Sequence, residues 1–496
     1  MISEALQRAR DFEKTHIPLV AEELPKFHVT GGVGWINDPN GFALYQGEYH
    51  LFYQYYPYET KWGPMHWGHV KTKDFIHWER IPAALAPDCA FDKDGCFSGG
   101  AVEMPDGRHL LMYTGVRTEC RENGETETVQ TQCIAIGDGV NYEKYAGNPV
   151  IGSEAVPEGG STTDFRDPHI WREDGRYYVV VGNRPADGSG AILLYQSEDA
   201  IHWEFVSQLD ACRNEYGKMW ECPDFFPLDG QHVLLVSPQD MQAIGREFHP
   251  GNANVCILGT YDRERHQLLR EHIQAIDYGL DFYAPQTLET MDGRRVMIGW
   301  MQNWETSGHV PAGQRFMGQM TIPRELTIRN GRLCQNPVRE LEGCRGAKAA
   351  HQNVLVTGET SLEGVWGRFL DLTVTVRPEE GAELYRWFQI DVARDGERKT
   401  SIRFTPADCL ICVDRTQSGL SWDMLHVREF PVSAGAESGQ LKLQLILDQY
   451  SLEIFVNDGE QAASNVIYTP LEAQDICFSC GGAARVDVEQ YVLEVD

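Results

Sequence analysis

The sequence predicts an all-β protein, with a five-bladed β-propeller, a C-terminal β-sandwich and a short helical arm at the N-terminus. Three observations support this prediction. A Gly-marked turn followed by an apolar strand recurs five times, and an Asp-marked turn recurs in step with it. After about residue 340 the repeat stops, and short segments that alternate apolar and polar residues follow. Such alternation is typical of strands with one buried face.

The first 26 residues are expected to form the helical arm, because residues 2–15 have helical composition around Leu6 and Ala9. We see no secretory signal in this segment, and no apolar run approaches the ~18 residues of a membrane span. The 13 scattered cysteines are therefore interpreted as reduced thiols of a cytoplasmic protein. A net charge of −30 argues against nucleic acid and anionic membranes as partners.

The repeat occupies residues 27–340 and predicts the propeller. Its turn glycines, 55 to 68 residues apart, are Gly47, Gly107, Gly175, Gly230 and Gly293. Asp-Gly between apolar runs, present in four of the five copies, is a strong hairpin pattern. The second turn is marked by Asp74, Asp138 and Asp199. Units of this length with several strands and no crossover helix favour propeller blades with long loops.

The repeat also places acidic residues at equivalent positions. Nine residues before the turn glycine, or eight in the third unit, stand Asp38, Ser98, Asp167, Glu221 and Ala284. The first strand of each blade lines the central axis, so we expect Asp38, Asp167 and Glu221 to meet at one mouth of the channel. A single acid at a strand end is ordinarily just solvated. Three in register are costly unless chemistry uses them.

The segment Trp35-Ile-Asn-Asp-Pro-Asn-Gly41 puts a carboxylate, two amides and an indole within seven residues. It could be an ordinary surface turn, which these residues also favour. Together with the acids in register it favours a polar ligand. Clustered carboxylates in an aromatic-rich protein, without metal, phosphate-loop or serine-nucleophile motifs, fit glycoside hydrolysis.

The neighbours of each acid suggest its role. Arg166 should keep Asp167 charged, whereas Trp220 and nearby phenylalanines could raise the pKa of Glu221 by desolvation. This favours Glu221 as the proton donor and Asp38 as the nucleophile. His66 is expected to be a hydrogen-bonded structural residue.

Several blocks, in order from about Phe27 to near the end, resemble glycoside hydrolase family 32, the β-fructofuranosidases, invertases and sucrose-6-phosphate hydrolases. They are Trp35–Gly41, Phe97–Gly100, Phe165–Pro168, Trp220–Pro223, Phe282–Gln286, Gly299–Met301 and Ser451–Gly459. The sequence departs from the family pattern in small ways, with Ile36 for a more usual Met and Gly100 for a frequent Ser. Gly100 leaves the substrate preference open.

The resemblance implies a retaining β-fructofuranosidase that cleaves sucrose. Asp38 would be the nucleophile, Glu221 the acid/base, and Asp167 the residue that binds fructose hydroxyls and stabilises the transition state. The fructose pocket would be shaped by Asn37, Gln54, Trp62, Phe97, Ser98, Arg166, Tyr283 and Trp300. Propeller core is the alternative for Trp62 and Trp300. No cofactor or metal is implied.

Residues 341–351 resemble a linker, and residues 352–496 are expected to form the sandwich, as a packing or oligomerisation module that leaves a homo-oligomer possible. Two Cys-x-x-Cys pairs lie here, Cys409/Cys412 and Cys477/Cys480. Their separation of 64 residues exceeds the ~15–20 of zinc ribbons, so buried core thiols are favoured over zinc.

Several alternatives stay open. Sucrose, sucrose 6-phosphate and fructo-oligosaccharides are all candidate substrates. An inverting arabinan- or xylan-type glycosidase would separate the two carboxyls by ~6.5–9.5 Å, against ~5–5.5 Å for a retaining enzyme. A sugar-binding propeller without catalysis is a third possibility, although binding needs no proton donor.

Overall fold

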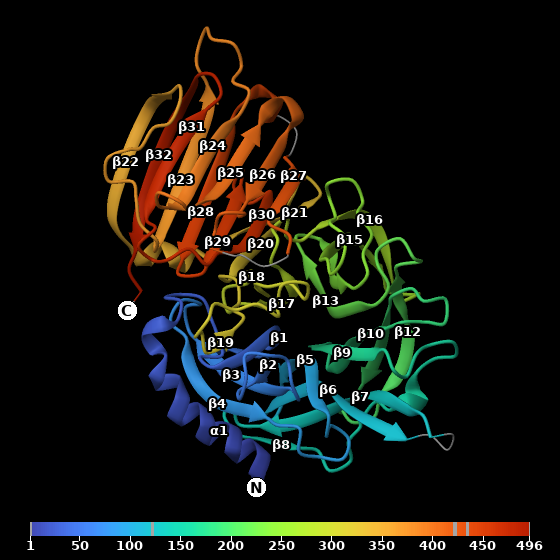
Figure 1. The fold of residues 1–496 in the computed structure, drawn as a ribbon. Helices are drawn as coiled ribbons and strands as arrows, with labels where there is room; N and C mark the ends of the chain where they lie inside the picture. The colour runs from blue at the N-terminus through green and yellow to red at the C-terminus, as the bar shows by residue number, and fades with distance from the viewer. Residues whose placement is uncertain (1, 121–123, 420–423, 433–435, 496) are drawn as a thin grey trace.

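The structure is a computed structural model that describes residues 2–120, 124–419, 424–432 and 436–495. It contains an N-terminal helix and two β-rich parts, one of five sheets and one of two (Figure 1). The protein is therefore all-β apart from this helix and short 3-10 turns, as predicted. In the described part of the chain no helix is long and apolar enough to cross a membrane.

Helix α1 (Glu4–His16) begins at Ser3, whose side chain accepts a hydrogen bond from the amide of Leu6. The helix contacts strand β4 (Glu79–Leu85) and buries Leu6, Ala9 and Glu13. Glu13 accepts a hydrogen bond from the Ala83 amide at 3.0 Å, and burial raises the pKa of Glu13 to about 7. Two short 3-10 turns follow, Ile17–Leu19 and Ala21–Glu23.

Five sheets follow, antiparallel except where β19 joins the first of them. The first consists of β1 (Gly34–Tyr45), β2 (Glu48–Tyr56), β3 (His66–Thr72), β4 and the later β19 (Phe316–Met317). The second consists of β5 (Gly95–Glu103), β6 (His109–Cys120), β7 (Thr126–Gly137) and β8 (Tyr142–Lys144). The third consists of β9 (Phe165–Glu173), β10 (Arg176–Asn183), β11 (Ala191–Ser197) and β12 (Glu204–Ala211), after a 3-10 turn at Ser153–Ala155.

The fourth sheet consists of β13 (Trp220–Leu228), β14 (Gln231–Pro238), β15 (Val255–Asp262) and β16 (Gln267–Ala275). The fifth consists of β17 (Tyr283–Glu289), β18 (Arg295–Trp300), β20 (Arg324–Arg329) and β21 (Arg332–Pro337). Local sequence explains the hairpins. In the Gln46-Gly47 turn both residues have positive φ, 49° and 78°, which suits the twist of the flanking strands.

The first strands of the five sheets contact one another in a closed circuit. β1 contacts β5, β5 contacts β9, β9 contacts β13, β13 contacts β17, and β17 contacts β1 again. Strand β19 adds a parallel pairing to β1, with Gly34 opposite Phe316 and Trp35 opposite Met317. This pairing was not expected from the repeat. It ties the segment after β18 to the first sheet. Because the circuit is closed, we expect residues at the starts of the five first strands to face a common centre.

The C-terminal part is a sandwich of two sheets, reached through a 3-10 segment at Arg339–Cys344. One sheet runs β22 (Arg345–Val356), β32 (Ala484–Leu493), β23 (Leu370–Pro378), β28 (Leu441–Asp448), β29 (Ser451–Val456) and β30 (Gln461–Val466). The other runs β27 (Val427–Pro431), β26 (Leu410–Asp414), β25 (Thr400–Thr405), β24 (Phe388–Arg394) and β31 (Asp475–Cys480). Short 3-10 turns lie at Pro406–Asp408 and Ala436–Ser438. Apolar residues of both sheets share one core.

The four Cys-x-x-Cys sulfurs are all free thiols. Cys477 and Cys480 are buried, as predicted, whereas Cys409 and Cys412 are only half-buried, so the prediction of core thiols is wrong for that pair. Cys409 follows a 3-10 turn in a left-handed conformation, φ 50°, which interrupts the strand pattern assumed for it.

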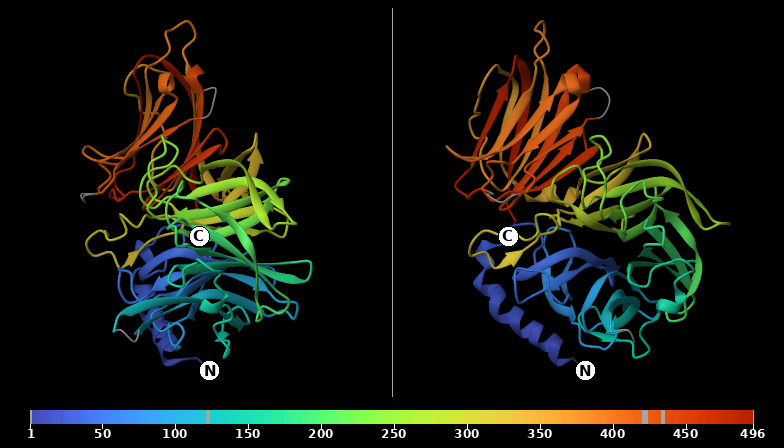
Figure 2. Two further views of the ribbon diagram at one scale, coloured as in Figure 1. Left: turned by 90° about the vertical axis from the view of Figure 1, so that its right-hand side faces the viewer. Right: turned by 45° about the vertical axis from the view of Figure 1, so that its right-hand side comes forward.

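Buried charges join the two parts, which pack against each other in all three views (Figures 1 and 2). Arg324 of β20 binds Asp277 at 2.9 Å and also binds Glu453 of β29. His28 lies between Asp448 at 2.8 Å and Glu453 at 2.9 Å. All five side chains are inaccessible to solvent. Glu453 belongs to the C-terminal block Ser451–Gly459, so this block supplies a charge to the network between the two parts.

We expect Arg324→Gln to lower the free energy of unfolding by about 3–5 kcal/mol, because Asp277 would stay buried without a cation and Glu453 would keep only His28. Urea unfolding followed by tryptophan fluorescence measures the loss. Arg339→Gln is the matched control, since Arg339 is exposed and pairs with Glu325. Its loss should stay below about 1 kcal/mol. Equal small losses in both variants would contradict a structural role for the buried network.

The pH dependence of stability should report on His28. Burial alone would lower its pKa, but the hydrogen bonds and charges of Asp448 and Glu453 outweigh burial and raise the pKa from 6.5 to about 9. The resulting stabilisation is complete below pH 6.5 and is lost as pH rises through about 9. We expect a loss of about 3 kcal/mol over this interval. The slope should be much smaller in His28→Gln, and an unchanged slope would contradict the assignment.

Candidate active site

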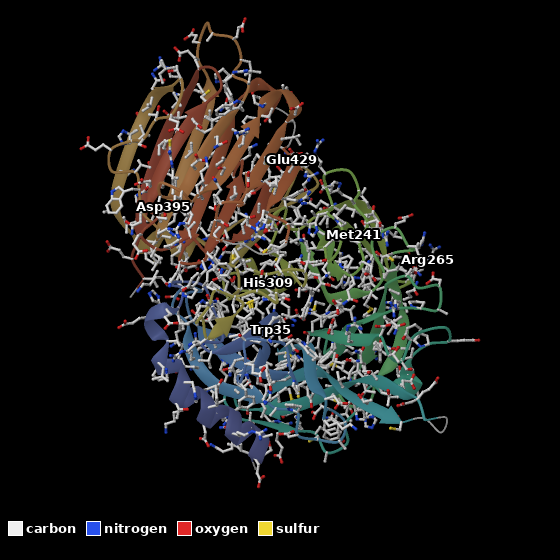
Figure 3. All side chains as sticks on the ribbon, viewed as in Figure 1. Trp35, Met241, Arg265, His309, Asp395 and Glu429 are labelled. Carbon is white, nitrogen blue, oxygen red and sulfur yellow. The ribbon has the colours of Figure 1, made fainter. Side chains whose placement is uncertain are left out.

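Three carboxylates from different sheets meet at the centre of the circuit. Asp38 lies on β1, Asp167 on β9 and Glu221 on β13. Cys222 connects them, because its Sγ lies 3.5 Å from Asp38 Oδ2 and 3.6 Å from Asp167 Oδ2, and its amide donates to Asp167 Oδ2 at 3.0 Å. Trp35, labelled in Figure 3, lies on the same strand as Asp38. The structure thus brings together the three acids that the repeat placed in register.

Irregular strand pairing directs these side chains. In every sheet the register between the first and second strands shifts near the predicted site position. On the first strands the shifts fall at Ile36/Pro39, Phe97/Gly99, Arg166/His169, Glu221/Asp224 and Tyr283/Gln286. Asp167, Cys222 and Ala284 have positive φ of 66°, 47° and 50°. A bulge adds a residue to one strand and turns its side chain away from the alternating pattern. Such backbone conformations are costly outside glycine and cluster at functional sites.

The two oxygens of Asp38 have different surroundings. Oδ2 accepts a hydrogen bond from Ser98 Oγ at 2.6 Å. Oδ1 is buried and has no hydrogen-bond partner among the described residues. Burial, with the charge of Glu221, raises the pKa of Asp38, and the hydrogen bond from Ser98 opposes this increase. Ser98 therefore orients one oxygen, whereas the other is buried without a hydrogen bond in the described ranges, and Asn37 lies close enough to oppose the rise in the pKa of Asp38 as well.

Arg166 pairs with Glu221 and Asp164. Its Nε donates to Glu221 Oε1 at 2.9 Å, and another nitrogen binds Asp164 at 2.9 Å. Burial and the charge of Glu221 raise the pKa of Asp167 to about 7, although Arg166 acts against both. The expectation that Arg166 keeps Asp167 ionised is therefore corrected. Sequence adjacency placed the cation beside Asp167, but the bulge turns its side chain toward Glu221.

Glu221 is held by two donors, one on each oxygen. Arg166 binds Oε1, and the hydroxyl of Tyr283 donates to Oε2 at 2.7 Å. Burial and Glu221 raise the pKa of Tyr283 far above its usual range, so Tyr283 remains a donor. Trp220, expected to desolvate Glu221, instead buries its ring and donates to the Tyr216 carbonyl at 2.7 Å. The direct contacts of Glu221 are thus polar.

The other predicted pocket residues are mostly buried around this centre. Asn37 Oδ1 accepts from the Trp35 indole at 2.8 Å, and Gln54 donates to the Cys96 carbonyl at 3.0 Å. Trp300 is completely buried beside Trp35, with ring centres 6.0 Å apart. The remaining two predicted aromatic residues, Trp62 and Phe97, contact each other, and Trp62 reaches the protein surface. Trp62 is 49% exposed and meets Phe97 edge-on at 6.0 Å.

Sequence reasoning missed three residues of this site. Cys222 bridges two acids and could have been noticed, since it follows Glu221 within the block Trp220–Pro223. Asp164 binds Arg166 at 2.9 Å. Trp304 stacks on Trp35 with ring centres 5.9 Å apart, from the long connection between β18 and β19. That connection matches no block, so no pattern pointed to Trp304.

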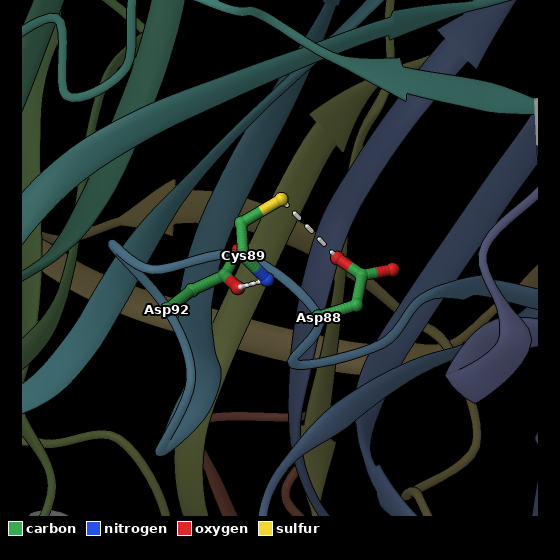
Figure 4. Close-up of side chains that lie close together, drawn as sticks. All are labelled: Asp88, Cys89 and Asp92. Carbon is green, nitrogen blue, oxygen red and sulfur yellow. Dashed lines mark hydrogen bonds between the residues drawn. The ribbon is translucent and has the colours of Figure 1, made fainter.

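One group of residues away from this site has the composition of a metal site. This group consists of Asp88, Cys89 and Asp92 (Figure 4), and no second group of this kind occurs among the described residues. Lys144 Nζ lies 2.6 Å from a carboxylate oxygen of Asp88 and 2.6 Å from one of Asp92. The ammonium group therefore stands where a cation would bind, and the chain balances these charges itself.

Buried carboxylates that meet from different sheets, one of them held by two donors, suit a glycoside hydrolase site. The protein is a glycoside hydrolase. More narrowly, the chain belongs to glycosyl hydrolases family 32. The model of that family's N-terminal domain matches residues 28–337, and the model of its C-terminal domain matches residues 340–492.

Individual relatives and solved structures support the same family. A sucrose-6-phosphate hydrolase of Zymomonas mobilis is 36% identical over 456 residues, covering 89% of this chain and 85% of the relative. A raffinose invertase of Escherichia coli is 36% identical over 463 residues, covering 91% of each chain. Among solved structures, a Bombyx mori family 32 β-fructofuranosidase mutant in complex with sucrose superposes with a TM-score of 0.83 at 32% identity, covering 99% of this chain and 98% of that one.

We expect Ser98→Ala to move the acidic limb of the pH profile of kcat/KM to higher pH by about one unit. The hydroxyl stabilises ionised Asp38, so its loss raises the pKa of Asp38 further. Ser207→Ala is the control, because Ser207 donates to the His266 carbonyl in a different sheet. An unmoved acidic limb would show that Asp38 does not set it.

Proposed function

We propose that this protein is a retaining β-fructofuranosidase, which hydrolyses the terminal β-D-fructofuranosyl bond of sucrose through a fructosyl-enzyme intermediate. The observation that carries the proposal is the asymmetry of Asp38, with Oδ2 held by Ser98 and Oδ1 without a partner among the described residues. A nucleophilic carboxylate needs one oriented, unencumbered oxygen. Membership of family 32, with relatives named sucrose-6-phosphate hydrolase and raffinose invertase, supports fructosides as the substrate class.

In the first step Asp38 Oδ1 attacks the anomeric carbon of the fructosyl group. The bond to the leaving oxygen breaks, and Glu221 gives its proton to that oxygen. In the second step water attacks the same carbon, Glu221 takes the proton of the water, and Asp38 leaves as a carboxylate. Tyr283 and Arg166 keep both Glu221 oxygens in fixed positions through these transfers.

Asp167 suits the recognition of fructose hydroxyls. With a pKa of about 7 it can accept or donate a hydrogen bond near neutral pH. We extend the same proposal to the pocket residues Asn37, Gln54, Trp62, Phe97, Ser98, Arg166, Tyr283 and Trp300. Trp62 and Phe97, at the edge of the group, would contact the sugar that leaves.

Two structural interpretations accompany this function. We interpret the closed circuit of five sheets as a five-bladed β-propeller, because each first strand contacts the next and the last contacts the first. We also propose a helical arm at residues 1–26, a catalytic part at 27–340 and a sandwich after it; the linker expected at 341–351 is shorter, because β22 (Arg345–Val356) already belongs to a sandwich sheet. A cytoplasmic location is proposed from the sequence alone.

Sucrose 6-phosphate is the second candidate substrate. The Zymomonas mobilis relative and a Lactobacillus gasseri structure, 25% identical with a TM-score of 0.82, both carry the name sucrose-6-phosphate hydrolase. A reducing-sugar assay that compares sucrose, its 6-phosphate and a short fructo-oligosaccharide ranks the three.

Replacing the nucleophile tests the mechanism. Asp38→Asn should lower kcat on sucrose by at least about 10³-fold, because an amide cannot form the ester. Asp106→Asn, in an exposed turn, is the control and should retain full activity. Retention is tested by adding methanol to the wild-type reaction, where NMR should detect methyl β-D-fructofuranoside. The α-anomer, or near wild-type activity of Asp38→Asn, would overturn the proposal.

A further inference from the structure

A chain of alternating charges leads from Glu221 toward solvent. Arg166 Nε binds Glu221 at 2.9 Å, Arg166 also binds Asp164 at 2.9 Å, and Asp164 binds Arg184 at 2.5 Å. The side chains of Glu221, Arg166 and Asp164 are 14%, 9% and 18% exposed, whereas that of Arg184 is 41% exposed. The chain therefore begins at the acid/base and ends at a half-exposed cation.

The proposed reaction indicates which part of the substrate lies along this line of charges. Glu221 must touch the oxygen that leaves, so it borders the leaving sugar as well as the fructosyl group. In an enzyme that removes a terminal fructosyl group, that group occupies the closed end of the site, and the leaving sugar extends toward solvent. In that arrangement the residues that run outward from Glu221 would border the leaving sugar, with Arg184 at their outer end.

The backbone around Arg184 is fixed by neighbouring contacts. Asn183 donates to the carbonyls of Ser161 and Asp164 at 2.7 and 2.9 Å. The amide of Ala186, two residues beyond Arg184, donates to the Gly159 carbonyl at 2.9 Å. These bonds join the connection after β10 to the segment before β9. The backbone that carries Arg184 is thus fixed by hydrogen bonds, so less conformational entropy is lost when Arg184 binds a ligand.

The four charges alternate, two acids with two arginines, so Arg184 ends the line as a cation in a chain whose net charge is −30. Arg166 is shared by Glu221 and Asp164, and Asp164 is shared by Arg166 and Arg184. The ion pair with Asp164 engages one nitrogen of Arg184, and that guanidinium makes no second ion pair among the described residues. A planar guanidinium with free N–H groups fits the paired oxygens of a phosphate.

We propose that Arg184, positioned by Asp164, is a specificity-determining residue that binds a phosphate group on the leaving sugar. The inference rests on the proposed fructosidase function and refines it. A phosphorylated disaccharide would lie with its fructosyl group at Asp38 and its phosphate at Arg184. Sucrose would use the same site without this contact.

Steady-state kinetics on sucrose and sucrose 6-phosphate test the assignment in wild type, Arg184→Gln and Arg184→Lys. Arg184→Gln should lower kcat/KM for sucrose 6-phosphate about ten-fold or more, mainly through KM. Its kcat/KM for sucrose should stay within about two-fold. Arg184→Lys should recover part of the loss, because it keeps the charge and loses the fork. The loss should shrink at high salt.

Arg176→Gln is the matched control. Arg176 lies at the other end of β10, is half-exposed, and pairs with Glu198 at 3.3 Å. It should change neither substrate's kinetics. A second measurement uses competitive inhibition by glucose 6-phosphate and by glucose. Arg184→Gln should weaken inhibition by the phosphate only.

The outcomes separate the two proposals. Turnover of neither substrate by wild type would end the proposed function and this inference with it. Turnover of sucrose with equal effects of Arg184→Gln on both substrates, or with no effect, would overturn this inference and leave the fructosidase intact. A loss confined to the phosphorylated substrate and to glucose 6-phosphate inhibition would support it.

Discussion

The structure depends on placing three acidic side chains in one buried site and compensating their repulsion. Asp38, Asp167 and Glu221 would repel one another strongly in a low-dielectric interior. Each therefore receives specific donors, and these come from different sheets. Ser98 is on β5, Arg166 on β9, Cys222 on β13 and Tyr283 on β17. Because no single sheet supplies both an acid and all of its donors, the site exists only when the circuit of sheets is closed.

Buried acids are also compensated by specific partners where the sandwich meets the five sheets. Asp277, Asp448 and Glu453 are buried there with Arg324 and His28. Removing one member of such a group leaves a charge without compensation, so the network favours one relative arrangement of the two parts. The sandwich supplies none of the three carboxylates, and its contribution is to hold the fifth sheet, which carries Tyr283, against the others.

Much of the fold and of the site could be predicted because both depend on local patterns. Turn residues repeated at similar intervals, so hairpins and blade-like units were visible in the chain. Counting back from these turns aligned the acids, since each unit places its first strand in the same way. Partners across the site could not be predicted. Adjacency suggested that Arg166 serves Asp167, but bulges rotate the side chains, and Arg166 binds Glu221 instead. Trp304 and the β19 pairing belong to a connection without any repeat.

The sequence by itself determined the all-β class, the family, and the three carboxylates, because each is recorded in short runs of residues and in their spacing. Only the tertiary structure decided which donor meets which oxygen, why Asp38 keeps one oxygen free, and how Arg184 continues the line of charges outward from Glu221. The physical reason is that pKa values and hydrogen bonds depend on distances of a few ångströms between residues far apart in the chain. Those distances are created only when the strands close upon one another.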